Sequence, residues 1–256
     1  MNSALESSYW RVSVVDITGS TQTDLTALIR NNQAREGDVL VTEYQSAGRG
    51  RLDRSFIAEP GSALLFSFFI IPKVNPSEAK RELGWIPLLA GQALCATLRE
   101  AANPDSPIEP LLKWPNDILI NDRKVAGILT ERIDSINRTG VVIGIGVNFF
   151  ATREKLPAPN ATSLVIEGFR QPDREELLIS FLIKMSEYLK RWENGDSSLL
   201  AEYRDRSRTL GQAVTIELPT GEIIEGDAAS IDHSGALLLK DGRKITVGDV
   251  VHLRTN

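Results

Sequence analysis

The segment KWPNDILINDRKVAGILTERIDSINRTGVVIGIGVNF, residues 113–149, decides the fold class of this chain. Three of its stretches, 117–120, 124–133 and 139–149, are rich in Ile, Val and Leu, and a further short run at 110–114 leads into the first of them. Turn-forming Pro, Asn and Asp residues separate these runs. Short apolar runs between such turns predict neighbouring strands of a sheet.

Hydrophobic spacing outside this segment predicts further helices and strands. The run SALLFSFFII at 62–71 has the continuous hydrophobicity of a strand buried on both faces. The polar stretches 45–56 and 149–164 fit neither pattern and are expected to be loops. The predicted helices are 21–32, 85–101 and 175–192, and the other predicted strand is 37–44.

The last fifty residues change to short alternating strands, which predict a small β-barrel. We therefore expect two domains, 1–207 and 208–256. The second carries five Lys and Arg against seven Asp and Glu, a net charge of 5 − 7 = −2. That charge argues against a barrel that binds oligonucleotides.

Composition narrows the classes of function. The chain has 256 residues, 42% hydrophobic and 25% charged, and a net charge of 29 − 34 = −5, which is the wrong sign for a broad nucleic-acid surface. No stretch has the length of a membrane helix and the amino terminus lacks a secretory pattern, so we expect a cytoplasmic protein. Both histidines lie in the last quarter, which excludes His-based catalysis in the main body. The single Cys95 lies in an apolar stretch and is expected to be a buried thiol.

The loop AGRGRLDR, residues 47–54, is the first candidate site. Two glycines let the backbone approach an anion, and Arg49, Arg51 and Arg54 place three permanent positive charges within six residues. The alternative is a solvated charged turn. Because such closely spaced like charges repel each other until an anion arrives, phosphate binding is favoured.

A second group of polar residues lies within the deciding segment. Lys113, Asn116, Asp117 and Lys124 fall on or between adjacent predicted strands, and Gly127 lies inside a strand, where close backbone approach is the usual cause. Alone, this group fits a hairpin with surface charges equally well. The alternate glycines of GIGVN, 144–148, leave one face of a strand bare, either for a flat ligand or for tight packing.

Together these motifs resemble the biotin protein ligase family. The matching segments are ITGSTQ (17–22), EYQSAGRGR (43–51), KWPND (113–117), RKVAGIL (123–129) and GIGVN (144–148). The resemblance implies an α+β fold: a class II synthetase-like catalytic domain, with a mixed and largely antiparallel sheet, followed by an SH3-like barrel. It also implies the monofunctional type without a DNA-binding domain.

The resemblance also assigns site residues. The implied catalytic residues are Lys124, Arg51, Lys113 and Asp117. The implied biotin-binding residues are Ser20, Thr21, Gln22, Gln45, Gly48, Arg49, Gly50, Arg51, Lys124 and Gly127. The implied nucleotide-binding residues are Arg49, Arg51, Arg54, Phe56, Lys113, Asn116, Lys124 and Asn148. One departure stands inside the loop, where Asp53 occupies the place of the family's last glycine.

The activity that the resemblance implies has two steps. Biotin and ATP give biotinyl-5′-AMP and pyrophosphate, with Mg²⁺ on the ATP phosphates rather than on protein ligands, and a lysine of a biotin carboxyl carrier protein then attacks the anhydride. Neither specific DNA binding nor membrane association is expected. Two alternatives remain, a lipoate or octanoate transferase of the same catalytic fold and a non-catalytic biotin-sensing regulator.

Overall fold

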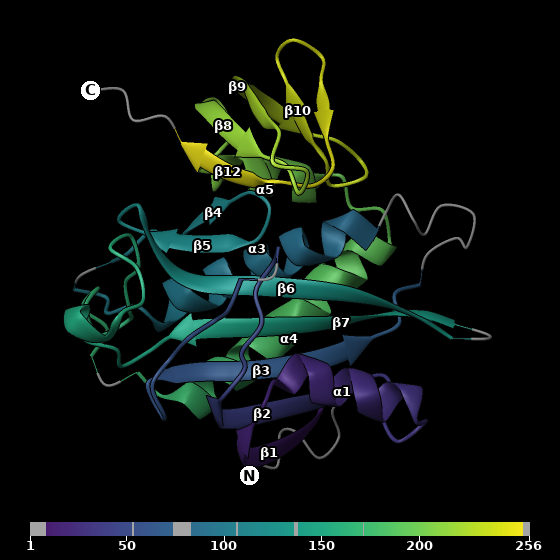
Figure 1. Cartoon of the computed structure of the whole chain (residues 1–256), viewed down its shortest axis with the longest axis vertical. Coiled ribbons are helices and arrows are strands. Elements are labelled where there is room, and N and C mark those ends of the chain that lie inside the picture. The colour runs from purple at the N-terminus through teal and green to yellow at the C-terminus, as the bar shows by residue number, and fades with distance from the viewer. Residues whose placement is uncertain are drawn as a thin grey trace.

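A seven-stranded sheet forms the centre of the molecule in the computed structural model, with strand order β1-β2-β3-β7-β6-β5-β4 (Figure 1). The structure describes residues 9–52, 54–73, 83–105, 107–135, 138–170 and 172–252. The strands are β1 (Arg11–Thr18), β2 (Asp38–Gln45), β3 (Ala63–Ile70), β4 (Leu111–Lys113), β5 (Asp117–Ile120), β6 (Arg123–Ser135) and β7 (Arg138–Asn148). The mixed, largely antiparallel sheet expected from the sequence is confirmed.

Among the described strands of this sheet, only the first pair is parallel. Strand β1 runs parallel to β2 because the chain returns through helix α1 (Thr21–Arg30), and every other neighbouring pair is antiparallel. The sequence reasoning missed β1. It lies at an edge of the sheet, and Val14, Val15 and Ile17 are exposed, so no clean alternation marks it.

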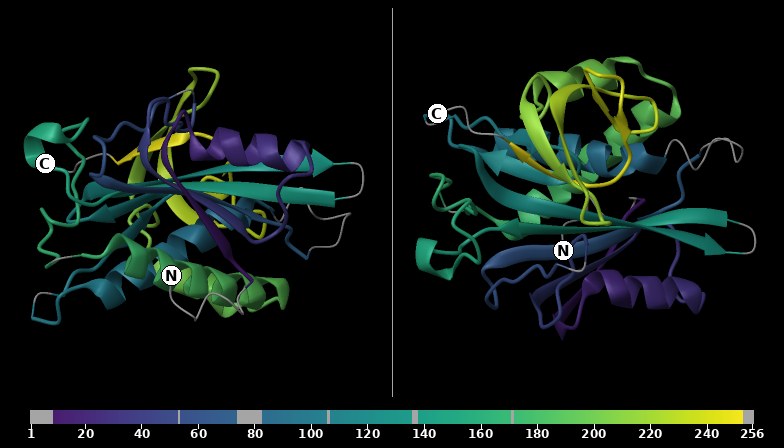
Figure 2. Two further views of the ribbon diagram at one scale, coloured as in Figure 1. Left: turned by 90° about the horizontal axis from the view of Figure 1, so that it is seen from below. Right: turned by 45° about the horizontal axis from the view of Figure 1, so that its top comes forward.

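Helices cover both faces of the sheet (Figure 2). Helix α1 packs on β3 and β7, while α3 (Ile86–Ala101) and α4 (Arg174–Glu193) pack against each other on the opposite face. This two-sided cover explains why every residue of β3 is buried, as its apolar run predicts. Pro87 is tolerated in the first turn of α3. None of the helices in the described ranges has both the length and the apolar character needed to cross a bilayer.

The carboxy-terminal part forms a second, antiparallel sheet beside the first (Figure 1). Its strand order is β11-β10-β9-β8-β12. The indoles of Trp85 and Trp114 donate hydrogen bonds across the junction, to the carbonyls of Asp232 (3.0 Å) and Gly235 (3.1 Å). Trp114 is thus a packing residue. The strands are β8 (Ala213–Glu217), β9 (Ile223–Ile231), β10 (Leu237–Leu239), β11 (Lys244–Ile245) and β12 (Asp249–His252), and a 3₁₀ turn spans Leu83–Trp85.

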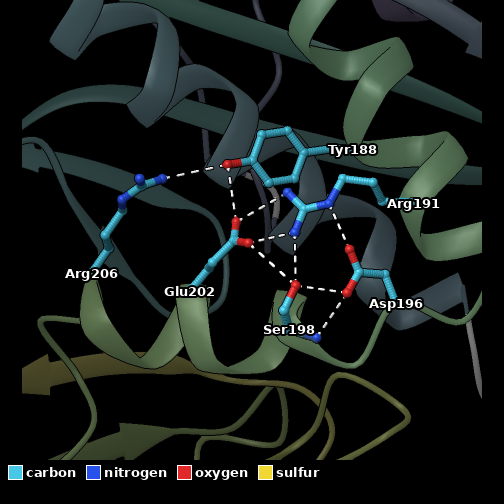
Figure 3. A network of polar contacts seen from close by, with 6 residues as sticks. All are labelled: Tyr188, Arg191, Asp196, Ser198, Glu202 and Arg206. Atoms are coloured by element: carbon cyan, nitrogen blue, oxygen red, sulfur yellow. Dashed lines mark hydrogen bonds and ion pairs between the residues drawn. The ribbon is translucent and has the colours of Figure 1, made fainter.

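A polar network joins α4 to the short helix α5 (Ser198–Asp205), which the sequence reasoning also missed (Figure 3). Arg191 donates to Asp196 Oδ2 at 2.7 Å and to both carboxylate oxygens of Glu202. The Tyr188 hydroxyl donates to Glu202 at 3.4 Å, and the Arg191 guanidinium lies 5.2 Å from the Tyr188 ring centre. The network fixes the helix pair that leads into the small sheet.

Candidate active site

A cavity of about 370 Å³ lies where the central seven-stranded sheet, the glycine–arginine loop (residues 46–56) and the small carboxy-terminal sheet meet. It opens on the same face of the central sheet as α1, whose first residues form part of its wall. The structure brings the predicted residues together in its lining with two exceptions, Gly48 and Asn148. The predicted residues that line it are Ser20, Thr21, Gln22, Gln45, Arg49, Gly50, Arg51, Arg54, Phe56, Lys113, Asn116, Asp117, Lys124 and Gly127.

One end of the cavity is polar and uncharged. Thr21 donates to Gln45 Oε1 from its backbone nitrogen (2.8 Å) and its hydroxyl (3.0 Å), and that hydroxyl lies 2.8 Å from Ser67 Oγ. Ser67 in turn reaches Gln22 Oε1 at 3.4 Å. Ser20 caps α1. All of these side chains except that of Gln45 are buried, so the end offers donors and acceptors shielded from water.

The glycine–arginine loop is the segment 46–56, and its described residues, 46–52 and 54–56, fold back on one another beside the cavity. Gly50 N donates to the Arg54 carbonyl at 2.7 Å, and Phe56 N donates to the Gly48 carbonyl at 2.9 Å. A Cβ on Gly48 would lie 2.3 Å from the Phe56 carbonyl oxygen, so this glycine serves the closure of the loop and not the lining. Asp53, the departure noted in the sequence, lies outside the described residues.

Positive charge gathers at the other end of the cavity. Arg51 Nη1 donates to Asn116 Oδ1 and to the Gly248 carbonyl, each at 3.2 Å. Lys124 Nζ lies 2.6 Å from Asp117 Oδ1, across the β5–β6 pair. Burial lowers the pKa of Lys113 and of Arg51 below their ordinary values, because desolvation disfavours a charged group. An anion that binds beside these cations would offset the cost of burying their charge.

Three glycines on β6 and β7 shape the floor of the cavity. A Cβ on Gly144 would lie 2.6 Å from Gln22 Oε1, and one on Gly146 would lie 2.5 Å from the Phe56 ring. A Cβ on Gly127 would lie 3.2 Å from Lys124 Nζ. The bare face of β7 therefore makes room for side chains of the cavity itself, which in turn face its interior.

Asn148 serves the loop that follows β7. Its amide donates to the Thr162 carbonyl at 2.9 Å, and its side chain does not line the cavity. The same loop is tied to β6 beside the catalytic candidate, since Lys124 N donates to the Asn160 carbonyl and Thr162 N donates to the Lys124 carbonyl, both at 2.8 Å. Asn160 thereby joins the cavity lining.

The sequence reasoning missed several lining residues. Ser67 carried a usable signal, because it is the one polar residue inside the apolar run of β3. Glu217 and Asp249 reach the cavity from the small sheet, 69 and 101 residues beyond the end of the nearest motif, GIGVN at 144–148. No local pattern reports a contact across such a separation.

Comparisons with known proteins agree with this architecture. The model of the biotin/lipoate A/B protein ligase family matches residues 14–148, and that of the biotin protein ligase C terminal domain matches residues 209–253. The chain belongs to the biotin/lipoate A/B protein ligase family.

Several relatives of this chain within the family are ligases. The biotin–[acetyl-CoA-carboxylase] ligase of Mycobacterium tuberculosis is 38% identical over 250 residues, 96% of this chain and 90% of that protein. The bifunctional ligase/repressor BirA of Bacillus subtilis is 32% identical, over 90% of this chain and 69% of its own length. The solved biotin protein ligase of Aquifex aeolicus, in complex with biotin and ATP, has a TM-score of 0.76 at 27% identity, covering 96% of this chain and 99% of that one.

Proposed function

We propose that this chain is an ATP-dependent biotin protein ligase. The biotin carboxylate attacks the α-phosphorus of ATP, giving biotinyl-5′-AMP and pyrophosphate, and a carrier lysine then attacks the acyl carbon and releases AMP. The observation that carries the proposal is one cavity with an uncharged hydrogen-bonding end and a cationic end. Biotin has the matching polarity, with a neutral ureido ring and a carboxylate at the tip of an apolar tail.

The ureido ring binds at the uncharged end. A buried urea needs acceptors for its N–H groups and donors for its carbonyl, because unpaired buried polar groups are costly. Thr21, Gln22 and Gln45 provide both kinds of group, with Ser20 and Ser67 beside them. The tail then runs along Gly127 toward the cations.

The reaction centre lies at Lys124. Two anions must approach each other there, the biotin carboxylate and the α-phosphate, and a fixed cation between them stabilises the charge that develops. Asp117 holds the Lys124 ammonium in place at 2.6 Å and is positioned to orient the acceptor amine in the second step. Arg51 and Lys113 take the phosphate oxygens. Retention of the anhydride by Arg51 keeps biotin transfer directed to the carrier.

The nucleotide binds under the glycine–arginine loop. The Phe56 ring covers Gly146 and provides an apolar surface for the base, while Arg49, Arg54 and Asn116 border the phosphates. Mg²⁺ enters as part of the nucleotide substrate. The Asp117 carboxylate is already paired with Lys124. The natural ligands of Mg²⁺ are therefore the phosphate oxygens of the nucleotide.

The carrier and the compartment follow from the same proposal. The acceptor is a lysine of a biotin carboxyl carrier domain, such as that of acetyl-CoA carboxylase, reached in the cytoplasm. A net charge of −5 disfavours DNA as a second partner. A lipoate or octanoate transferase is the alternative, but an aliphatic acyl chain leaves the uncharged polar end without partners, which a buried polar site rejects.

Detection of the adenylate tests the proposal. The protein is incubated with biotin and Mg-ATP, biotinyl-5′-AMP is measured by mass spectrometry, and a carrier domain is then added. We expect the adenylate first and a biotinylated carrier lysine second. A protein that binds biotin but forms no adenylate is the non-catalytic regulator, and that result would replace the proposal.

A further inference from the structure

Asp249, the first residue of β12, reaches the glycine–arginine loop from the small sheet. One of its carboxylate oxygens pairs with Arg54 Nη1, and the other lies 3.5 Å from Arg51 Nη1. The adjacent Gly248 carbonyl accepts from that same Arg51 nitrogen at 3.2 Å. The Asp249 side chain is 18% exposed and that of Arg51 is 21% exposed, so this pairing is shielded from solvent.

The backbone presents Asp249 rigidly. Strand β12 pairs with β8, in a register that sets Asp249 opposite Glu217. Gly248 has φ +151°, and a Cβ there would lie 2.7 Å from the Ile216 side chain, so only glycine brings β12 this close. The carboxylate is therefore held by the small sheet, whereas the two arginines belong to an irregular loop.

Two other cations of the cavity have acidic partners of their own. Lys124 pairs with Asp117, and Arg49 pairs with Glu131 at 3.1 Å, on the other side of the loop. Glu217 is a weak neighbour of Arg54, at 4.0 Å and largely exposed. Asp249 is thus the principal anion that Arg51 and Arg54 contact among the described residues. Like both arginines, Asp249 lines the cavity.

A triphosphate in the cavity meets Asp249 in two ways. Its oxygens are bidentate acceptors of the kind that arginine prefers, so they compete with the carboxylate for the same guanidinium groups. Its negative charge also repels the carboxylate at close range. Both effects oppose nucleotide binding for as long as Asp249 stays charged and in place.

We propose that Asp249 is a positioning residue that holds Arg51 and Arg54 beside the cavity in the absence of nucleotide. When nucleotide binds, both arginines leave Asp249 and contact the phosphates. The inference rests on the proposed function, because it takes the phosphate-bearing substrate from there. In the free protein the carboxylate orders the loop, and on binding the loop exchanges one anion for another. The small sheet thereby sets both the resting position of the loop and the affinity for nucleotide.

Asp249→Asn tests the exchange because it keeps the shape and removes the charge. Binding of α,β-methylene ATP in the presence of biotin and Mg²⁺ is measured by calorimetry, which needs no turnover. We expect the dissociation constant to fall by about five- to tenfold, the worth of one partly shielded ion pair. Asp249→Glu retains the charge and should stay within about twofold of the parent protein. The matched control is Asp227→Asn, which removes a carboxylate paired with Lys240 in the same small sheet, outside the cavity.

Two further readouts separate this role from a merely structural one. In the ligand-free protein, backbone amides of residues 46–56 should exchange hydrogen faster in Asp249→Asn than in the parent. In an Arg54→Gln background, Asp249→Asn should change the affinity by less than half as much in free energy, because part of the competition is gone. Thermal melting of each variant checks that the fold is retained.

The outcomes are separable. An unchanged or weaker affinity in Asp249→Asn overturns the inference and leaves the proposed function intact. Unchanged exchange at residues 46–56 overturns it as well, because the carboxylate then does not hold the loop. If the parent protein fails to bind the analogue at all, both the inference and the proposed function fall.

Discussion

The ammonium of Lys124 is the group on which the proposed chemistry depends most. It enters the cavity from β6, and at Lys124 the backbone lies between Leu119 of β5 on one side and the Asn160–Thr162 segment on the other. We expect Lys124→Ala to fold normally and to lose adenylate formation by about two to three orders of magnitude, equivalent to about 3–4 kcal/mol at the barrier. Single-turnover formation of biotinyl-5′-AMP measures the effect.

Lys155→Ala is the matched control for that variant. Lys155 is exposed, pairs with Glu59 and does not line the cavity, so its loss should leave the rate within about twofold, as expected for a surface pair. A Lys124→Ala protein as fast as this control would remove Lys124 from the reaction centre.

Cys95 should be chemically silent in the folded protein. It is 1% exposed within α3, and burial raises its pKa to about 12. The reactive thiolate is therefore nearly absent at pH 8, and reagent access is blocked as well. Iodoacetamide labelling followed by mass spectrometry should give no adduct in native protein and one adduct in denaturant. Rapid native labelling would contradict the buried position that the sequence already predicted.

Among single residues, those inside compact motifs were the most predictable. Lys113, Asp117 and Lys124 fall within twelve residues of each other, and two short strand pairs bring them together. Gly48 and Asn148 were also expected at ligands; they lie outside the cavity lining and support the loops beside it, so their contact with ligands stays a prediction. A motif shows that a residue belongs to the region of the site. Only the packing around that residue shows whether its side chain faces the cavity or supports a neighbouring loop.

At the scale of elements, the glycine–arginine loop should tighten when ligands bind. Its described residues, 46–52 and 54–56, contain like charges and one isolated bridge, Arg49 with Ser55, and no regular strand. Biotin together with α,β-methylene ATP should slow hydrogen exchange at this loop by at least about tenfold, because phosphates supply acceptors for several donors at once. Exchange measured by mass spectrometry, with β3 as the internal reference, checks this. Equal protection with and without ligands would contradict closure.

The loop after β7 is a narrower case. Residues 149–164, the other loop expected from the sequence, are held more firmly, because Phe149 is buried and Ser163 donates to the Ala151 carbonyl at 2.6 Å. Two backbone hydrogen bonds tie Asn160 and Thr162 to Lys124. We therefore expect the ligand-dependent change in exchange to be confined to residues 154–160.

The α4–α5 network should make stability depend on pH. Hydrogen bonds from Arg191 lower the pKa of Glu202, and those from Ser198 and Arg191 lower that of Asp196 to about 2. A carboxyl group with a lowered folded-state pKa stabilises the fold above its unfolded pKa and loses that contribution as the pH falls through the folded value. Glu202→Gln should therefore lower the free energy of unfolding by about 1 kcal/mol at pH 7, allowing for partial screening by solvent.

Urea titrations at pH 7 and pH 3 measure this difference. It should shrink at the lower pH, where the parent carboxyl group approaches protonation. Glu187→Gln, on the exposed face of α4 and 3.9 Å from Lys184, is the control and should change little at either pH. A Glu202→Gln effect that is equal at both pH values would show that shape rather than charge holds the helices.

Elements with a strong hydrophobic pattern, either helical spacing or a continuous apolar run, were predicted to within a few residues. The helix expected at 175–192 is α4, Arg174–Glu193, and the strand expected at 62–71 is β3, Ala63–Ile70. The elements that were missed, β1 and α5, bury few side chains. Tertiary pairing and the Arg191 network stabilise them, and neither leaves a hydrophobic period in the sequence.

For the whole molecule, the fold class could be predicted from the sequence. The contribution of the small sheet to the wall of the cavity could not. The motifs indicated a mixed sheet followed by a small barrel, and the structure has a seven-stranded and a five-stranded sheet. The proposed division at residue 207 stays a prediction. Local sequence patterns could not predict the contact between the small sheet and the glycine–arginine loop, where Asp249 pairs with Arg51 nearly 200 residues away in sequence. Such contacts arise only when separate elements pack.

In the proposed function, one cavity recognises biotin at its uncharged end and activates it at its cationic end. The most direct test compares pyrophosphate release by the protein with Mg-ATP and biotin, octanoate or lipoate at equal concentrations. We predict release with biotin at least about a hundredfold faster than with either aliphatic acid, because a site built from hydrogen-bonding groups rejects an acid that leaves them unpaired. Equal or faster release with octanoate or lipoate would contradict the account.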